Sequence, residues 1–181
     1  RDPGVYGYFG NMKEQQSPDC SCYVKNGPFI GTSKNVDFIR YADVLLFKAE
    51  ALIQLNRYTE ALPIINQIRA RAAASTTMTL AAGASNVYKV QPYDSFPSKE
   101  YAMKALMFER RLEFGMEGPR FFDLVRWGIA EPVLNAYLNV EKTKRDFLSN
   151  AKFTAGRDEY YPIPQREIDF TGGLYKQNPK Y

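Results

Sequence analysis

The feature that most constrains this chain is a stretch near its middle, residues 108–128, in which charged and aromatic residues alternate at helical spacing. It reads FERRLEFG, then MEGP, then RFFDLVRWG. Gly115 is typical of the residue that follows a helix, and Pro119 is typical of a first helical residue. The pattern therefore predicts two helices that meet at a corner, with carboxylates and guanidinium groups able to face each other.

The charges of this stretch indicate ion pairs. Arg110 stands three residues from Glu113, and Asp123 stands three residues from both Arg120 and Arg126, whereas Glu109 has no arginine partner in its own helix. Arg40, Asp43 and Glu50 follow at steps of three and seven further upstream, where they either meet this cluster across a helix interface or form a solvated face. We predict a structural ion-pair cluster, with these members: Arg40, Asp43, Glu109, Arg110, Glu113, Arg120, Asp123 and Arg126.

The same carboxylates raise the question of catalysis. Paired carboxylates would suit a glycosidase, but arginine partners lower a carboxyl pKa, which is the wrong direction for a general acid. The chain has no histidine, so the commonest general base and the usual zinc ligand are missing. The sequence predicts no catalytic residue, no metal site and no cofactor.

Composition narrows the classes of protein to which the chain could belong. The net charge of +4 comes from basic residues interleaved with acids, which argues against a nucleic-acid-binding surface. No apolar run has the roughly 18 residues of a membrane helix. Because the chain starts at Arg1 without a signal sequence, we expect a fragment of a longer protein. Cys20 and Cys22 are separated by one residue, and we interpret them as two thiols in an irregular segment rather than as a bridge.

Residues 36–73 carry the clearest helical pattern. Apolar residues recur at steps of three and four from Phe38 to Ile53 after a possible N-cap at Asn35, and a second stripe runs from Ala61 to Ala72. Residues 56–58 provide the turn. The pair matches a tetratricopeptide (TPR) hairpin in part, without a second copy in the chain.

The rest of the chain organises around this hairpin. Residues 1–35 are expected to be an irregular lead-in, residues 98–128 a second helical pair, and residues 160–181 an extended C-terminal segment. A long connection, residues 74–97, separates the two helical pairs. The expected fold class is mainly α, with TPR-like helical hairpins and long irregular loops, and 1–181 as the C-terminal part of one larger domain.

Aromatic residues outside the helical stripes are the candidates for ligand contact, because sugars stack their C–H faces on aromatic rings. The alternative is that these rings anchor their loops on the scaffold. The candidates are Tyr6, Tyr8, Tyr88, Tyr93 and Phe96.

Four blocks of the sequence resemble the SusD/RagB family. FIRYADVLL with AEAL resembles the family's signature helix, and INQIRARA is similar to the helix that follows it. ERRLE, EGPR and DLVRWG resemble its third block, while YPIP, EI and QNP resemble its closing segment, with Lys180 where glycine is common. The blocks cover about 35–128 and 160–181 in the family's order.

The resemblance implies a lipoprotein of the bacterial outer membrane, facing outward, that binds glycans or peptides and partners a TonB-dependent transporter of the SusC type. Its lipid anchor, signal peptide and much of its ligand site would lie outside this chain. The motif residues match the family's scaffold, so none is assigned as a ligand contact. Two other interpretations stay open: a TPR-like protein-interaction module unrelated to nutrient uptake, and a glycan-processing enzyme. The ligand, the oligomeric state and the role of Cys20 and Cys22 are left open by the sequence.

Overall fold

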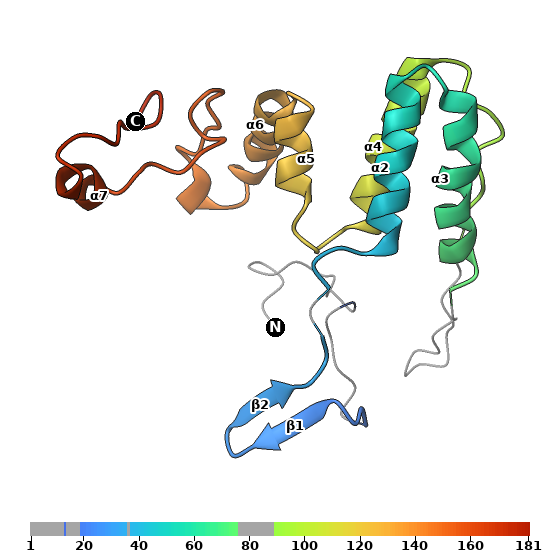
Figure 1. Ribbon diagram of the computed structural model, residues 1–181, viewed down its shortest axis with the longest axis horizontal. Coiled ribbons are helices and arrows are strands. Elements are labelled where there is room, and N and C mark those ends of the chain that lie inside the picture. The colour runs from blue at the N-terminus through green and yellow to red at the C-terminus, as the bar shows by residue number, and fades with distance from the viewer. Residues whose placement is uncertain (1–12, 14–18, 36, 76–88) are drawn as a thin grey trace. The chain divides into compact units, whose positions relative to one another are not determined.

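A computed structural model of the chain describes residues 13, 19–35, 37–75 and 89–181. The chain divides into two compact units, Arg1–Met116 and Glu117–Tyr181. Helices are the main regular elements of both units, and the short strands are confined to one hairpin in the described residues (Figure 1). The expected fold class, mainly α, is therefore confirmed.

Two helices form the predicted hairpin region. α2 (Tyr41–Gln54) and α3 (Tyr58–Ala73) run antiparallel, joined by the short turn at Leu55–Arg57 (Figure 1). Asn56 occupies the left-handed region, with φ 60°, which asparagine tolerates better than most residues. Short connections of this kind place consecutive helices side by side.

The start of α2 differs from the expectation. The apolar stripe includes Phe38 and predicts a helix from an N-cap at Asn35, but α2 begins at Tyr41 after an extended Arg40. The side chain of Phe38 is 95% exposed and Ile39 is 73% exposed. The upstream part of the stripe therefore has no core to pack against among the described residues, and the pattern starts the helix five residues too early.

A third helix completes the core of the first unit. α4 (Lys99–Glu113) packs against both α2 and α3, and Ser98 caps it by accepting a hydrogen bond from the Tyr101 backbone N–H at 3.2 Å. Ala49 and Ala61 are completely buried, which lets α2 and α3 approach closely. The fully buried aliphatic side chains around them each contribute about 1.5–3 kcal/mol of burial; they are Leu46, Ile53, Ile65 and Leu106.

The region expected as an irregular lead-in contains a β-hairpin, which corrects that expectation. β1 (Tyr23–Asn26) pairs antiparallel with β2 (Phe29–Thr32), with Tyr23 opposite Thr32. The two-residue turn places Gly27 at φ 60° before Pro28. Such turns need a positive φ to match the twist of the strands, so glycine at this point was the signal that the sequence interpretation missed.

Cys20 and Cys22 form a disulfide, which corrects their interpretation as free thiols. A tight turn precedes β1, since the Tyr23 backbone N–H donates to the Cys20 carbonyl at 2.9 Å. The turn brings the two Cα atoms to 5.1 Å, within the range that a disulfide spans. One intervening residue is thus enough for a bridge when the backbone folds back.

The second unit is smaller and less regular. It contains α5 (Arg120–Arg126), α6 (Ala130–Glu141), the 3₁₀ turn η1 (Asp146–Leu148) and α7 (Gln165–Phe170). Its core is built on Leu124, Ala130 and Phe153. Asn135 of α6 holds the Phe153 backbone by two reciprocal hydrogen bonds of 2.9 Å.

The C-terminal segment, residues 160–181, is extended only in part, because α7 interrupts it. The side chain of Gln177 donates to the Ile163 carbonyl and accepts from the Ile163 backbone N–H, at 2.9 and 2.8 Å. These two hydrogen bonds connect the segment around Pro162 and Pro164 to the end of the chain. The angle between α4 and α5 stays a prediction, since these helices belong to different units.

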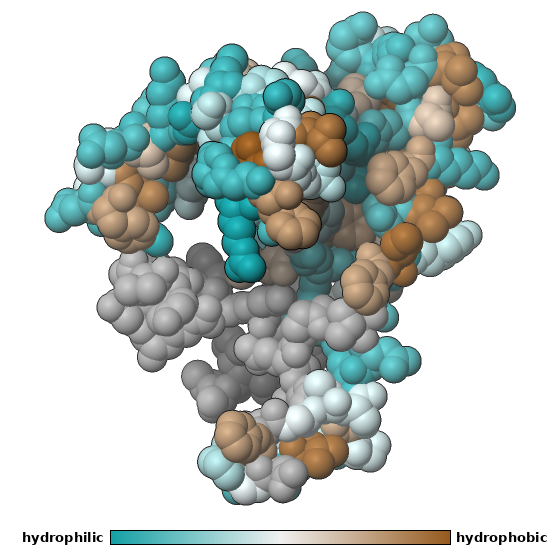
Figure 2. Space-filling model, turned by 60° about the vertical axis from the view of Figure 1, so that its left-hand side comes forward, coloured by the Kyte–Doolittle hydropathy of each residue, from teal (hydrophilic) through white to brown (hydrophobic). Residues whose placement is uncertain are grey.

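Many large apolar side chains lie open to solvent. Figure 2 shows hydrophobic residues scattered among hydrophilic ones on the face that it draws. Phe38 in the first unit and Tyr161 in the second are almost completely exposed. Apolar side chains of this size mark surfaces that contact other molecules or other chain segments when they gather into patches.

Candidate functional site

The predicted aromatic contacts fall into two groups. Tyr6, Tyr8 and Tyr88 lie outside the described residues. Tyr93 and Phe96 lie in the segment that leads into α4, where they contact each other with ring centroids 5.6 Å apart. Phe96 is buried in the core of the first unit, as a ring that anchors its loop would be.

Tyr93 is held in place by contacts with three side chains, those of Asn66, Glu109 and Arg69. Its backbone N–H donates to the side-chain oxygen of Asn66 at 2.8 Å, and the Asn66 amide donates back to the Tyr93 carbonyl at 2.9 Å. The Tyr93 hydroxyl donates to Glu109 at 3.1 Å, and the Arg69 guanidinium lies 4.5 Å from the ring centroid. One face of the ring is therefore already occupied by a cation.

The surroundings of Tyr93 change its ionisation. Burial and the neighbouring Glu109 carboxylate raise the pKa of Tyr93 to about 12, with burial as the larger cause. A tyrosinate at this position would lose its hydration and face another negative charge. The hydroxyl therefore stays a hydrogen-bond donor throughout the neutral range.

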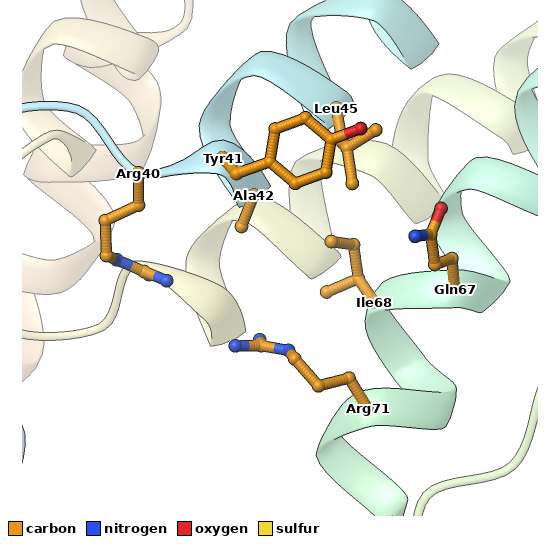
Figure 3. A pocket seen from close by; sticks show the side chains of 7 residues that line it. All are labelled: Arg40, Tyr41, Ala42, Leu45, Gln67, Ile68 and Arg71. Carbon is orange, nitrogen blue, oxygen red and sulfur yellow. The ribbon is translucent and has the colours of Figure 1, made fainter.

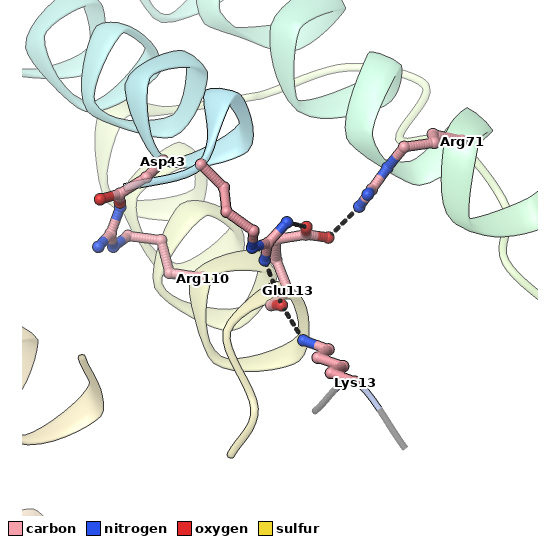
Figure 4. A network of polar contacts seen from close by, with 6 residues as sticks. Lys13, Asp43, Arg71, Arg110 and Glu113 are labelled. Atoms are coloured by element: carbon pink, nitrogen blue, oxygen red, sulfur yellow. Dashed lines mark hydrogen bonds and ion pairs between the residues drawn. The ribbon is translucent and has the colours of Figure 1, made fainter. Parts of the chain in front are cut away.

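Glu113 is the centre of a polar network at the end of α4 (Figure 4). Its carboxylate pairs with Arg40 at 2.8 Å and with Arg71, and its backbone carbonyl accepts from Arg40 at 3.2 Å and from Lys13. Only 8% of the Glu113 side chain is exposed. One buried carboxylate thus joins the N-terminus of α2 and the last turn of α3 to α4.

Arg110 is the most deeply buried charged residue among the described residues, and it pairs with Asp43. Its Nη1 donates to the Asp43 Oδ1 at 2.7 Å, and the Arg110 side chain is 1% exposed. The guanidinium lies 4.5 Å from the Phe47 ring centroid and 5.1 Å from that of Phe114. Arginine suits this position because its flat cation stacks on aromatic rings while it bonds a carboxylate.

Glu109, which has no partner within its own helix, pairs with Arg69 of α3. One of the two interpretations of the sequence places its partner on the upstream helix, α2, whereas the structure places it on α3. Sequence analysis missed Arg69 and Arg71 as members of the network. Arg69 follows the buried Ile65 by four residues and Arg71 follows Ile68 by three, so helical spacing places both beside the buried residues of α3, although the Arg71 side chain is itself exposed.

Two of the predicted cluster members, Asp123 and Arg126, pair within the second unit. Asp123 accepts from the Arg126 Nε at 2.9 Å within α5, and the Asp123 side chain is only 5% exposed. The Arg126 guanidinium also lies 4.7 Å from the Trp127 ring. Arg120 is the first residue of α5. The Asp123–Arg126 pair lies within one short helix, whereas the ion pairs of the first unit connect the three helices of its core.

A cavity of about 320 Å³ opens between the start of α2 and the last turns of α3 (Figure 3). Its walls combine an exposed tyrosine ring, aliphatic side chains, one amide and two guanidinium groups, from Arg40, Tyr41, Ala42, Leu45, Gln67, Ile68 and Arg71. Because two of these residues also bind Glu113, the polar network shapes one edge of the cavity. We refer to it as the α2–α3 pocket.

The chemistry of the α2–α3 pocket favours binding. It presents donors from Gln67 and Arg71, an aromatic face from Tyr41 and apolar surface from Ile68. Its lining holds no carboxylate and no thiol, and so offers no acid–base pair. The described residues also contain no group of three or more metal-ligating side chains, and no helix among them is long and apolar enough to cross a membrane.

Comparison with known proteins agrees with this architecture. The sequence profile of the SusD family matches residues 21–181. Among curated proteins of Formosa agariphila, SusD-like protein P38 is 39% identical over 55% of this chain and 18% of its own length. SusD-like protein P2 of the same organism is 26% identical over 83% of this chain and 26% of its own length.

Two solved structures share the fold. A SusD homolog from Bacteroides thetaiotaomicron is 30% identical over 80% of this chain, with a TM-score of 0.63. A SusD superfamily protein from Bacteroides vulgatus is 32% identical over 79% of this chain, with a TM-score of 0.57. This chain covers 26% and 27% of those two chains, so it spans about a quarter of their length.

Proposed function

This chain belongs to the SusD family, and we propose that it takes part in binding a glycan or another nutrient at the outward-facing surface of the bacterial outer membrane. The match over residues 21–181 carries this proposal. The relatives named SusD-like and the shared fold of the two solved structures support it. The partner would be a TonB-dependent transporter of the SusC type, and membrane attachment would come from a lipid anchor outside this chain.

We assign the chain no catalytic step. The buried carboxylates of α4 are held by arginines, Glu109 by Arg69 and Glu113 by Arg40. A general acid needs a raised carboxyl pKa, whereas a guanidinium partner favours the ionised form. Ligand would therefore leave the protein chemically unchanged.

The α2–α3 pocket is the part of the first unit that best suits a polyhydroxylated or peptide ligand. Tyr41 is 71% exposed, so its ring is free to stack on a sugar or a side chain. Gln67 and Arg71 lie across the opening from it, on α3 (Figure 3), with donors for hydroxyl or carbonyl oxygens. Tyr6, Tyr8 and Tyr88 remain proposed contacts from outside the described residues.

The test is calorimetric titration of the complete protein against a panel of glycans and peptides, followed by the same titration with pocket variants. Tyr41→Ala should weaken the best ligand about 3- to 10-fold, the worth of one aromatic contact. Gln67→Leu should weaken it about fivefold, the worth of one neutral hydrogen bond. Tyr137→Ala is the matched control, because Tyr137 is an exposed tyrosine of α6 that does not line the pocket.

Two results would count against the proposal at different levels. Unchanged affinity in both pocket variants would move the ligand site away from the α2–α3 pocket while leaving nutrient binding in place. Conversion of a panel glycan into smaller products by the purified protein would contradict a purely binding role.

A further inference from the structure

A second cavity lies wholly within the C-terminal unit. Its volume is about 310 Å³, and four of its lining residues are consecutive, Asp158–Tyr161, at the start of the proline-rich segment. The lining is dominated by aromatic rings and two carboxylates, from Phe121, Phe153, Asp158, Glu159, Tyr160, Tyr161 and Tyr181. We call it the C-terminal cavity.

The aromatic walls pass from buried to exposed. Phe153 is buried, and its ring meets Phe121 edge to face with the centroids 6.3 Å apart. Tyr160 and Tyr161 are exposed instead, with Tyr161 at 93%. The cavity therefore has an apolar interior and tyrosine rings at its mouth, whose π faces attract cations.

A third tyrosine ring of the lining, that of Tyr181, already contacts a cation. The Arg157 guanidinium lies 5.6 Å from the Tyr181 ring centroid and pairs with Asp158 at 2.7 Å. Asp158 also accepts from the Thr154 backbone N–H at 2.6 Å. The hydrogen bond from Arg157 is the largest cause that lowers the pKa of Asp158. The charge of Asp158 is thus compensated within the unit.

The charge of Glu159 is not compensated in this way. Its Oε2 is fully buried and accepts no hydrogen bond from any described residue. Two cations that directly precede cavity residues in the chain are engaged elsewhere, Arg157 with Asp158 and Lys180 with the Ala155 carbonyl. Burying a carboxylate oxygen without a hydrogen-bond donor is energetically unfavourable. A ligand that supplies such a donor would therefore be stabilised at this position.

We propose that the C-terminal cavity binds an organic cation, an ammonium or guanidinium group on an apolar stem, with Glu159 as its charge partner. The stem would lie against Phe121 and Phe153, while the cation meets Glu159 and the tyrosine rings. A neutral sugar hydroxyl could supply the missing donor, but it would leave the carboxylate charge unbalanced. Such a site would exist whether or not the α2–α3 pocket binds the nutrient.

The experiment uses the 181-residue chain and small probes that differ only at the cationic end. Nα-acetyl-lysine N-methylamide is titrated against Nα-acetyl-norleucine N-methylamide, which keeps the stem and lacks the ammonium. We expect the lysine probe to bind at least about tenfold more tightly, since a charge-assisted hydrogen bond is worth that much. Methyl glucosaminide and methyl glucoside form a second pair, which shows whether an amino sugar supplies the cation better than a peptide does.

Variants identify the groups responsible. Glu159→Gln should remove the preference for the lysine probe and leave norleucine binding within about twofold. Tyr161→Ala should weaken the lysine probe several-fold, and its side chain is too exposed for the change to unfold the unit. Glu167→Gln, at an exposed carboxylate of α7, is the matched control and should change nothing. Tyrosine ring NMR signals locate the bound probe.

Three outcomes would overturn the proposal. The first is equal affinity for the lysine and norleucine probes, which would mean an apolar cavity only. The second is tighter binding of methyl glucoside than of either amine. The third is unchanged lysine binding in both Glu159→Gln and Tyr161→Ala, which would place the cation elsewhere.

Discussion

Replacing Arg110 by alanine is the sharpest test of the ion-pair core. Arg110 is fully buried between α2 and α4, bonds Asp43 at 2.7 Å and stacks on the rings of Phe47 and Phe114. Arg110→Ala removes the cation and its aromatic contacts together, and it leaves Asp43 without this partner.

The magnitude follows from burial on each side of the pair. Breaking a buried pair costs about 3–5 kcal/mol, because the remaining charge is left uncompensated. The Asp43 side chain is 21% exposed and so recovers some hydration, which favours the low end of that range. The lost cation–π contacts add about 0.5–1 kcal/mol each. Since such terms are not additive, we expect a loss of about 3–4 kcal/mol in the free energy of unfolding.

Urea unfolding followed by circular dichroism measures this loss. The control is Arg57→Ala, because Arg57 pairs with Glu60 at 2.7 Å on the surface, where both side chains are more than half exposed. That variant should show no resolvable change. A double-mutant cycle with Asp43→Asn should give a coupling of about 1–3 kcal/mol. A loss below about 1 kcal/mol in Arg110→Ala would refute a stabilising role for the buried pair.

Three further predictions concern single groups. The folded-state pKa of Tyr93 is raised from 10.0 to about 12, so the protein should lose stability as the pH rises from about 10 to about 12. Tyr93→Phe should remove the part of this loss that comes from Tyr93, as urea unfolding across that pH range would show. Asp123→Ala should lower the free energy of unfolding by about 1–2 kcal/mol, less than a fully buried pair because Arg126 is 34% exposed and can turn to water; unchanged urea unfolding would contradict it. Alkylation of the unfolded, unreduced chain should leave Cys20 and Cys22 unmodified, and reduction should expose both, as mass spectrometry would show.

The helices were largely predictable from local sequence, because their signals are local. The apolar period marks α2 and α3, and Ser98 marks the start of α4 through its side-chain cap. The errors arose where a local signal needed tertiary context. Phe38 extends the apolar stripe beyond α2, since hydrophobicity alone does not show whether a core lies next to it.

Sequence reasoning predicted which residues belong to the charged network better than it predicted which of them pair with each other. Helical spacing shows which face of a helix carries Asp43 or Glu113, but not which other helix that face meets. The pairs of the first unit join residues 73 and 40 positions apart, as in Arg40 with Glu113 and Arg69 with Glu109. Only the packing of α2, α3 and α4 brings these groups together. The α2–α3 pocket was missed for the same reason, because its two walls come from different helices.

The central claim is that the buried charges hold the scaffold while ligand binds at the exposed pocket. The most direct test measures unfolding and ligand affinity on the same variants of the complete protein. Arg110→Ala should lose about 3–4 kcal/mol of stability and keep the affinity of its folded fraction. Tyr41→Ala should keep its stability and bind the best ligand about 3- to 10-fold more weakly. Full stability with abolished binding in Arg110→Ala would contradict the account, because it would make the buried pair part of the ligand site.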